Sequence, residues 1–239
     1  MTGAARGIGA SIAARLLNDG WGVLALDLDD QGLAALERSC QAPALLTMAG
    51  DVTDPEFVSR AVSEGAALGP VVAGVANAGI FSDSRLPKMT DDQWQRVIDV
   101  DLTAPFLLAR AMWPAMVDHG FGRLVFMSSV SKDGNFGQAN YAASKAGLVG
   151  LAQTAAIEGG GFGITSNVIC PGSIDTPLNA SFKESAPAAY EKFMARVPAG
   201  RPGQPADIAA TCAFFLREEA GYVNGQVIYV DGGLSSGHT

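Results

Sequence analysis

The stretch Thr2-Gly3-Ala4-Ala5-Arg6-Gly7-Ile8-Gly9 decides the fold of this 239-residue chain, because it joins a glycine-rich turn to an amphipathic segment, residues 10–17. Glycines permit positive φ angles and let a phosphate group come close to the main chain. The free N–H groups and positive dipole end of a following helix favour an anion at that place. The stretch predicts a phosphate-binding turn, although a glycine pattern alone also fits an ordinary turn.

A short apolar run, Gly22-Val-Leu-Ala-Leu26, follows this helix and ends at Asp27. The run is typical of a buried strand, which leaves the carboxylate of Asp27 at the strand's carboxyl end. A carboxylate about 20 residues past a glycine turn is placed to bind ribose hydroxyls in a dinucleotide-binding unit. The turn and Asp27 together therefore predict a dinucleotide site.

Three side chains near the middle of the chain, Ser129, Tyr141 and Lys145, could move a proton to or from a carbonyl oxygen. Tyr141 and Lys145 are four residues apart, so a helix would present both on one face. A free tyrosine has a pKa of about 10, and a nearby ammonium lowers that value. The serine could hold the reacting oxygen by a hydrogen bond. Taken alone, the pattern fits a chance Tyr and Lys on an amphipathic helix equally well.

With both patterns present, the chain resembles the short-chain dehydrogenase/reductase family over nearly its whole length, and residues 134–147 are most similar to bacterial 3-oxoacyl-carrier-protein reductases. None of the shared motifs is decisive alone, but in this order and spacing they are specific as a set. The family's TGxxxGxG pattern matches Thr2–Gly9, its Asp-Val pair matches Asp51–Val52, and its NNAG turn appears as Ala76–Gly79. Its YxxxK matches Tyr141–Lys145, its PGxxxT matches Pro171–Thr176, and its last strand and turn match Gly225–Gly233.

The resemblance implies hydride transfer between a nicotinamide and a carbonyl or secondary-alcohol carbon. Tyr141 would be the general acid in reduction and the base in oxidation. Lys145 would lower the pKa of Tyr141 and bind the nicotinamide ribose, while Ser129 would stabilise the developing alkoxide. Enoyl reductases of this family space the tyrosine and lysine further apart, so reduction of C=O is favoured over C=C. The residues expected to bind the cofactor are Gly3, Arg6, Gly7, Ile8, Gly9, Asp27, Asp51, Val52, Asn77, Gly79, Tyr141, Lys145, Pro171, Gly172, Ile174 and Thr176.

The charges around Asp27 bear on the choice between NAD and NADP. Asp27 can accept hydrogen bonds from both adenosine ribose hydroxyls and repel a 2′-phosphate. Arg6 argues the other way, because its guanidinium could pair with that phosphate, although an exposed arginine without a role fits too. Asp29 and Asp30 add negative charge next to Asp27. We therefore expect NAD to be preferred over NADP.

The chain departs from the family pattern at its start, where only Met1 and Thr2 precede the glycine turn instead of a strand. That strand would lie at the centre of the sheet, and its loss would leave unpaired backbone groups on both neighbours. Either the working protein begins further upstream or another segment fills the gap. The cost of unpaired buried groups favours the first alternative.

A second departure is Asp101, at a position where the family usually carries Asn and holds a water in a proton relay. We count Asp101 among the candidate catalytic residues. If its carboxylate lies near Lys145, it should stabilise the ammonium and partly offset the effect of that charge on Tyr141. Turnover would then be lower than in an Asn variant. The alternative is a solvated helix carboxylate without a role.

The third departure concerns the catalytic serine, because the spacing to Tyr141 is one residue shorter than in the carrier-protein reductases. Counting back from Tyr141 selects Ser128, whereas aligning forward from the preceding strand selects Ser129. Adjacent strand residues face opposite ways, so only one hydroxyl can point into the site. We choose Ser129, because the register of the preceding strand determines which way a side chain points more reliably than the length of the following loop does.

Strand-like and helix-like runs alternate along the chain without a repeat or a linker, which predicts a single α/β domain over residues 1–239. Together with the resemblance, this indicates a doubly wound, Rossmann-type parallel sheet with helices on both faces and the first strand missing. Helix starts are expected at Asp54-Pro55, at the capping box Thr90-Asp-Asp-Gln93 and at Pro205. The expected later strands are 45–49, 71–76, 124–127, 166–169 and 227–230.

Composition excludes several classes of partner and location. A hydrophobic content of 48% with 17% charged residues is globular, and a net charge of −8 argues against nucleic acid or an anionic membrane. Cys40, Cys170 and Cys212 form neither a disulfide framework nor a metal-binding pattern, as is typical of reduced thiols in the cytoplasm. No signal segment opens the chain, and the apolar stretch 66–81 is too short to span a bilayer. We expect a cytoplasmic protein without a metal.

Residues 178–200 carry Phe182, Tyr190, Phe193 and Met194 at partly helical spacing. In the family this region covers the substrate, so we expect a mobile apolar lid, although a packed amphipathic helix fits the spacing as well. The expected substrate is a small carbonyl or alcohol. Two alternatives stay open: a 3-oxoacyl thioester reductase, for which an acidic chain offers no clear basic docking patch, and a non-catalytic dinucleotide-binding redox sensor. By family analogy we expect a homo-oligomer, specifically a tetramer.

Overall fold

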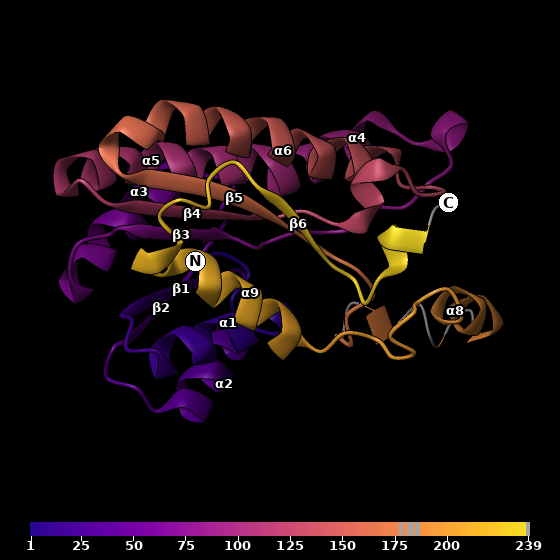
Figure 1. Ribbon diagram of the computed structural model, residues 1–239, viewed down its shortest axis with the longest axis horizontal. Coiled ribbons are helices and arrows are strands. Elements are labelled where there is room, and N and C mark those ends of the chain that lie inside the picture. Colours follow the sequence, from indigo (N-terminus) through magenta and orange to yellow (C-terminus); the bar gives the residue numbers. More distant parts are fainter. Residues whose placement is uncertain (177–178, 181–183, 185–186, 238–239) are drawn as a thin grey trace.

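The strands of the chain form two parallel sheets that meet edge to edge (Figure 1). The computed structural model describes all residues except 177–178, 181–183, 185–186 and 238–239. Every neighbouring pair of strands in the described residues is parallel. The first sheet contains β1 (Val23–Asp27) and β2 (Leu45–Ala49), and the second contains, in order, β3 (Ala73–Ala76), β4 (Gly122–Met127), β5 (Ile164–Pro171) and β6 (Val227–Val230).

Met1 and Thr2 join the two sheets by lying between β1 and β3. The amide of Leu26 donates to the carbonyl of Met1 over 2.9 Å, and the amide of Thr2 donates to the carbonyl of Val75 over 3.0 Å. The Met1 ammonium donates to the carbonyl of Leu24 over 2.7 Å. Thr2 and Leu26 form one parallel bridge, so the place of the expected first strand holds a single bridge in the described residues.

The helices cover both faces of this combined sheet, which confirms the doubly wound fold. The layer of α1, α2 and α9 packs on one face and the layer of α3, α5 and α6 on the other (Figure 1). The helices are α1 (Gly7–Asn18), α2 (Asp30–Cys40), α3 (Pro55–Gly65), α4 (Asp91–Ile98), α5 (Ala104–His119), α6 (Ala139–Gly159), α8 (Pro187–Met194) and α9 (Pro205–Leu216). A π-helical turn, Asp99–Thr103, joins α4 to α5.

The expected helix starts and strands are confirmed with small shifts. The carboxylate of Asp54 accepts from the amide of Glu56 at the start of α3, and Thr90 and Gln93 form the reciprocal capping box of α4. Pro205 opens α9. β2 and β6 have the expected bounds, β3 is shorter, and β4 and β5 are longer. Sequence alternation and cap chemistry therefore locate the elements within a few residues.

Two hydrophobic cores lie on opposite faces of the sheet and hold its strands in place. Along β4, Val125 and Met127 belong to the core under α1 and α9, whereas Leu124 and Phe126 belong to the core under α3, α5 and α6. This alternation is the two-residue period of a strand that is covered on both faces. The cores leave the carboxyl ends of the strands free to form a site.

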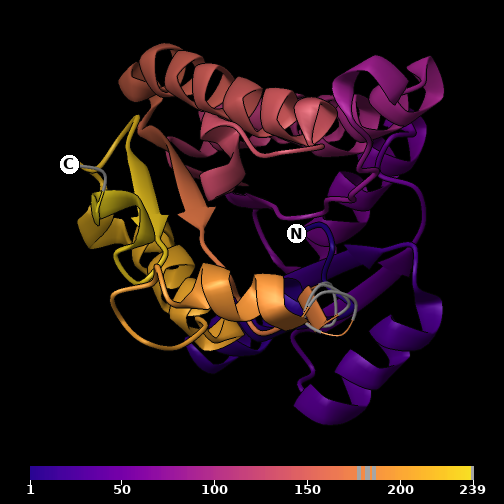
Figure 2. The ribbon, with the colours of Figure 1, turned by 90° about the vertical axis from the view of Figure 1, so that its right-hand side faces the viewer.

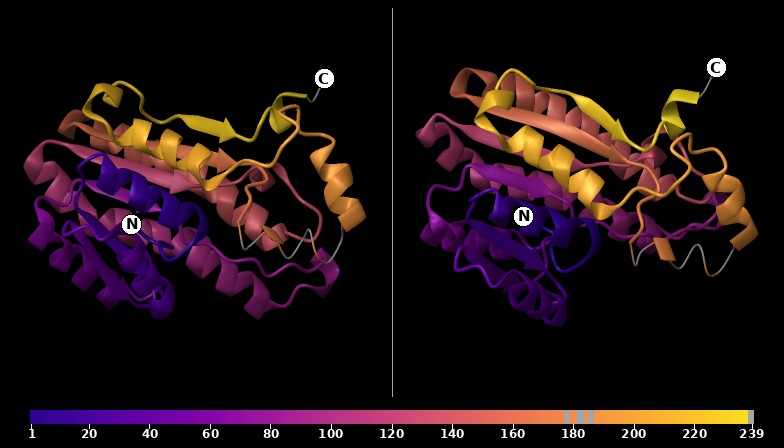
Figure 3. Two further views of the ribbon diagram at one scale, coloured as in Figure 1. Left: turned by 90° about the horizontal axis from the view of Figure 1, so that it is seen from below. Right: turned by 60° about the horizontal axis from the view of Figure 1, so that its bottom comes forward.

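The segment expected to form a lid contains α8, which projects beyond the carboxyl end of the sheet (Figure 3). Phe182 and Leu178 lie outside the described residues. Figure 2 looks onto this end of the molecule, with α8 toward the viewer. No helix of the described chain is long and apolar enough to cross a membrane.

Candidate active site

A cleft of about 1900 Å³ opens at the carboxyl ends of the strands and gathers nearly all the predicted site residues. Its wall includes the glycine turn, the ends of β1, β3, β4 and β5, and the start of α6. Two predicted residues do not line it: Gly9 and Asp101. In an open parallel sheet, ligands bind at this edge because the free helix N-termini and the loops meet there.

The glycine turn has no room for a side chain at Gly3 or Gly9. Gly3 has a φ of +65°, and a Cβ there would lie 2.7 Å from the Cα of Ala78. A Cβ on Gly9 would collide with the carbonyl oxygen of Gly3. The side-chain amide of Asn77 donates to that same carbonyl over 2.8 Å, so the turn is fixed to the end of β3.

The N-terminus of α1 fits a phosphate group. No side chain caps this helix, and its first turn carries no acidic residue. The first N–H groups of a helix lack intrahelical partners, and together with the helix dipole they attract an anion. Gly7 and Ile8, at the start of the helix, both line the cleft.

Asp27 and its neighbours form one end of the cleft. One carboxylate oxygen of Asp27 accepts from the amide of Ala5 over 2.9 Å, and the other accepts from the amide of Asp29 over 3.0 Å. The guanidinium of Arg6 lies 3.8 Å from the carboxylate of Asp29, with both side chains partly exposed. The candidate phosphate ligand Arg6 therefore already faces a carboxylate.

The remaining predicted cofactor residues lie along the same wall. Asp51 and Val52 line the cleft beside Asp27, and the Asp51 carboxylate accepts from the amide of Thr53 over 2.9 Å. At the opposite end, the amide side chain of Asn179 donates to the carbonyl of Ile174 over 2.8 Å. Also lining the cleft are Gly79, Pro171, Gly172 and Thr176. No group of three metal-ligating side chains occurs among the described residues.

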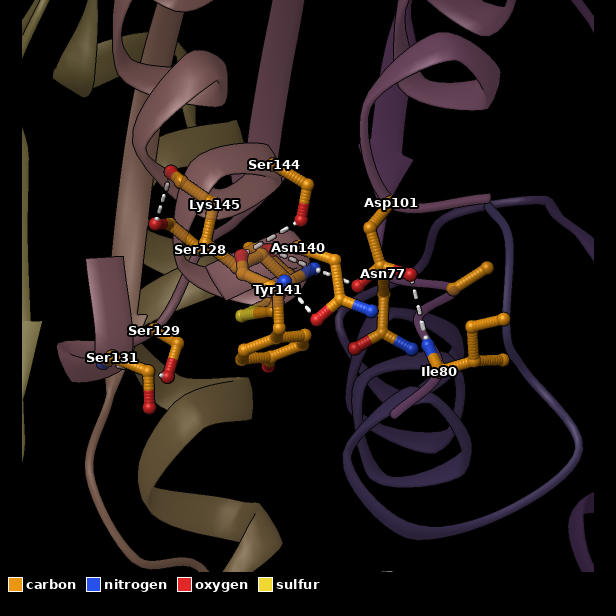
Figure 4. Close-up of polar contacts among 12 residues, drawn as sticks. Asn77, Ile80, Asp101, Ser128, Ser129, Ser131, Asn140, Tyr141, Ser144 and Lys145 are labelled. Atoms are coloured by element: carbon orange, nitrogen blue, oxygen red, sulfur yellow. Dashed lines mark hydrogen bonds and ion pairs between the residues drawn. The ribbon is translucent and has the colours of Figure 1, made fainter. Parts of the chain in front are cut away.

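Ser129 and Tyr141 come from different elements and meet in the cleft wall (Figure 4). Ser129 follows β4, and Tyr141 and Lys145 lie on one face of α6. The hydroxyl of Ser129 accepts from the amide of Ser131 over 3.1 Å, and it lies close enough to Tyr141 to lower the pKa of that phenol. The hydroxyl of Ser128 instead donates to the main-chain carbonyl of Lys145 over 2.8 Å. The two serines thus have different environments, and only the environment of Ser129 includes the phenol.

The surroundings of Tyr141 favour its neutral phenol over the phenolate. Burial raises the pKa of Tyr141, and the carboxylate of Asp101 raises it further, against the lowering influence of Lys145 and Ser129. Only 8% of the residue is exposed. Lys145 favours the phenolate, as expected from the sequence, but the desolvation that opposes it is the larger effect and does not follow from the motif.

Asp101 is fully buried and forms an ion pair with Lys145 (Figure 4). The two charged groups are 3.1 Å apart, and the side chain of Lys145 is 4% exposed. The other carboxylate oxygen of Asp101 accepts from the amide of Ile80 over 2.9 Å. Burial alone would lower the pKa of Lys145, but the nearby Asp101 and Tyr141 raise it. Burial also raises the pKa of Asp101, against the lowering influence of Lys145 and of the Ile80 amide, and the 3.1 Å contact is the evidence that the two groups pair. The alternative of a solvated carboxylate at position 101 is therefore wrong.

Two further residues support Tyr141 and were missed in the sequence. The ring of Phe81 packs edge-on against the ring of Tyr141, with 4.6 Å between centroids. Asn140 is fully buried, and its amide donates to the carbonyls of Ser82 and Gln93 over 3.0 and 2.9 Å. Asn140 directly precedes the tyrosine, but nothing in the local pattern signals its burial.

Comparison with known proteins gives matches over the whole chain. Residues 3–235 match the family model described as "Enoyl-(Acyl carrier protein) reductase". The 3-oxoacyl-[acyl-carrier-protein] reductase MabA of Mycobacterium tuberculosis (strain ATCC 25618 / H37Rv) is 40% identical, over 100% of this chain and 92% of its own length. The crystal structure of levodione reductase has a TM-score of 0.94 at 32% identity and covers 99% of this chain and 96% of its own. An actinorhodin polyketide ketoreductase crystallised with NADPH has a TM-score of 0.92 at 31% identity, over 98% and 95% of the two chains.

Proposed function

Because the chain belongs to the short-chain dehydrogenase/reductase family of oxidoreductases, we propose that it transfers a hydride between a nicotinamide cofactor and a carbonyl or secondary-alcohol carbon through Ser129, Tyr141 and Lys145. The observation that carries the proposal is the convergence of a hydroxyl, a phenol and an ammonium on the wall of one cleft. A protein that only bound a dinucleotide would not need these three groups together.

The residues around the cleft suit a nicotinamide dinucleotide. The uncapped N-terminus of α1 and the main chain of the glycine turn would hold the pyrophosphate. Asp27 would accept hydrogen bonds from ribose hydroxyls. The residues proposed to line the rest of its path are Asp51, Val52, Asn77, Gly79, Pro171, Gly172, Ile174 and Thr176. When bound, the nicotinamide ring would supply or accept the hydride.

The protein's own groups would handle the proton and the substrate oxygen. In reduction, the phenol of Tyr141 donates its proton to the carbonyl oxygen as that oxygen gains negative charge. The hydroxyl of Ser129 donates a hydrogen bond to the same oxygen. The ammonium of Lys145 stabilises the phenolate that remains, which then recovers a proton from solvent. Oxidation of an alcohol follows the reverse course, with the phenolate as base.

We propose NAD as the preferred cofactor. The carboxylate of Asp27 would repel a 2′-phosphate. Arg6 is the only cationic side chain on the glycine turn, and its guanidinium already lies 3.8 Å from the carboxylate of Asp29, so it is less free to pair with that phosphate. Likeness to the family does not decide the matter, since the actinorhodin ketoreductase was crystallised with NADPH.

A 3-oxoacyl thioester is the favoured substrate class. The name of the mycobacterial relative supports this class, and Phe81 and Phe193 give the cleft apolar wall. The family model carries the description of an enoyl reductase, but the spacing of Tyr141 and Lys145 favours reduction of C=O over C=C. A small ketone or alcohol remains the broader alternative.

Binding and turnover test the proposal in two steps. Nicotinamide fluorescence is followed as the purified chain is titrated with NADH and, separately, with NADPH; saturable binding with NADH preferred is expected. Oxidation of NADH is then measured with acetoacetyl-CoA and with cyclohexanone. Turnover should be lost in Tyr141→Phe and kept in Tyr222→Phe, which changes a fully exposed tyrosine. Cofactor binding without turnover of either compound would favour the redox-sensor alternative.

We further propose, from family likeness, a cytoplasmic homotetramer. Apolar side chains on the outer helical layer fit a covered surface: Phe106 on α5 is 41% exposed and Ile157 on α6 is 83% exposed. Light scattering of the purified chain measures the mass. A monomer at micromolar concentration would contradict the tetramer and leave the catalytic proposal untouched.

A further inference from the structure

We propose that Asp101 biases the site toward carbonyl reduction, by holding Lys145 in a buried ion pair without net charge so that Tyr141 keeps its proton through the neutral pH range. The inference rests on the proposed function of the cleft. It gives Asp101 a positioning and electrostatic role that acts through Lys145, because the carboxylate itself does not line the cleft.

The geometry of Asp101 leaves its carboxylate no partner in solvent. The residue is 0% exposed; one oxygen accepts from the amide of Ile80 over 2.9 Å, and the other faces the ammonium of Lys145 at 3.1 Å. The π-helical turn Asp99–Thr103 presents this side chain inward, and such turns are frequent at functional sites. A Cβ on Gly79 would lie 2.9 Å from the carboxylate, so the main chain closes over the pair.

The ion pair weakens the electrostatic effect of Lys145 on Tyr141. The ammonium lies 5.4 Å from the centroid of the tyrosine ring, and it also donates to the carbonyl of Met127 over 3.0 Å. An ammonium has three donors; here one of them bonds the carbonyl of Met127, and the carboxylate of Asp101 lies at ion-pair distance. A carboxylate at contact distance from the ammonium makes the pair a dipole, whose potential at Tyr141 is smaller than that of a lone charge.

The other polar and titratable groups around Tyr141 and Lys145 supply no further positive charge that would offset the carboxylate of Asp101. The groups facing them are Asp101 on the π-helical turn, Asp83 in the segment after β3, Ser129 after β4 and Cys170 on β5. Asp83 also raises the pKa of Tyr141, and burial keeps the thiol of Cys170 neutral by raising its pKa. Among these groups Lys145 is thus the cation, and the carboxylate of Asp101 neutralises its charge.

The consequence differs for the two reaction directions. Reduction needs the phenol, whose O–H bond breaks as the proton passes to the substrate oxygen, whereas oxidation needs the phenolate to take that proton back. A site that keeps Tyr141 protonated supports reduction from neutral into alkaline pH. Oxidation then reaches its full rate only at more alkaline pH.

Ionisation of Tyr141 can be measured without any substrate. The ultraviolet absorbance of phenolate is titrated in the full chain and in Tyr141→Phe, and the difference isolates this residue. In Asp101→Asn the midpoint should fall by about one pH unit or more, a tenfold change in the ionisation constant. Asp99→Asn, the same substitution on the same turn but at a carboxylate bonded to Gln95, should leave the midpoint unchanged. An unchanged or higher midpoint in Asp101→Asn would overturn the inference.

Two more variants separate this role from a structural one. Asp101→Ser, which is also neutral, should move the midpoint in the same direction and serves if the Asn variant does not fold. In a Lys145→Met background a buried carboxylate without a partner takes up a proton, so adding Asp101→Asn should have no further effect. A full change of the midpoint in that background would show that Asp101 does not act through Lys145 and would contradict the inference.

Turnover gives the second readout. Acetoacetyl-CoA and NADH serve in one direction, and 3-hydroxybutyryl-CoA and NAD in the other. In Asp101→Asn, the pH at which oxidation reaches half of its full rate should fall by about as much as the titration midpoint of Tyr141, and the pH at which reduction loses half of its rate should fall with it. A moved midpoint without turnover of either compound would support the role of Asp101 and count against the proposed function. Turnover with an unchanged titration midpoint of Tyr141 would support the proposed function and count against the role of Asp101.

Discussion

The side-chain amide of Asn77 donates a hydrogen bond of 2.8 Å to the carbonyl oxygen of Gly3 and so ties the end of β3 to the glycine turn. The same amide lies 3.3 Å from the carbonyl of Thr2. In return, the hydroxyl of Thr2 accepts from the amides of Asn77 and Ala78, each over 3.1 Å. A residue expected to position the cofactor therefore also builds the turn that would hold its phosphates.

Asn77→Ala should weaken cofactor binding and stability together. Loss of the hydrogen bonds to Gly3 and Thr2 costs about 1 kcal/mol for each bond, so we expect the dissociation constant for NADH to rise about tenfold. Fluorescence titration and thermal unfolding measure the two effects. Asn18→Ala, at the exposed end of α1, is the control. Unchanged NADH affinity in Asn77→Ala would mean that the turn keeps its shape without this tie.

Asp29→Asn should improve binding of NADPH by releasing Arg6 for the 2′-phosphate. The gain should be modest, up to about fivefold, because an exposed ion pair contributes about 0.2–1 kcal/mol. Asn keeps the N-cap hydrogen bond to the amide of Gly32, so stability should change little. The dissociation constants of NADH and NADPH check the prediction, and adding Arg6→Ala should remove the gain. A gain that survives Arg6→Ala would have another cause.

The two adjacent serines should respond in opposite ways to substitution. Ser129→Ala should lower kcat by about 100-fold, as for loss of one donor to a developing oxyanion, with little change in thermal unfolding. Ser128→Ala should keep most activity and lose about 1 kcal/mol of stability, because its buried hydroxyl bonds the carbonyl of Lys145. Retained turnover in Ser129→Ala with loss in Ser128→Ala would reverse the assignment.

Local patterns were enough to locate the elements and the order of the site residues. The N-cap at Asp54, the capping box at Thr90 and the apolar runs of β2 and β6 depend on neighbours in sequence, so they could be read directly. The convergence of Asn77 and Tyr141 on one cleft followed from the resemblance and the parallel sheet, because the carboxyl ends of such strands share one edge.

Burial at the site could not be predicted in the same way. The burial of Asp101 depends on a π-helical turn and on contacts with Ile80 and Lys145, which are distant in sequence. The pKa of Tyr141 depends on the desolvation that these contacts and the ring of Phe81 create. A motif specifies which groups are present, but the balance between burial and charge is set only when the chain is folded.

Gly79→Ala should disturb the Asp101–Lys145 pair directly. The added Cβ would lie 2.9 Å from the carboxylate oxygen of Asp101 and 3.2 Å from the ammonium of Lys145. Neither group can withdraw freely, because the amide of Ile80 and the carbonyl of Met127 hold them. We expect a loss of stability of about 1–3 kcal/mol from overpacking and a lower rate of acetoacetyl-CoA reduction.

Gly150→Ala is the matched control for this overpacking. Gly150 lies within α6, and nothing is within 4 Å of its added Cβ. Alanine there should raise stability by about 0.5–1 kcal/mol, because glycine is unfavourable inside a helix, and should leave turnover unchanged. Thermal unfolding and the rate of NADH oxidation measure both variants side by side. Full stability and full activity in Gly79→Ala would show that the main chain at Gly79 can move to make room for the methyl group. The ion pair would then be less firmly enclosed than its contacts indicate.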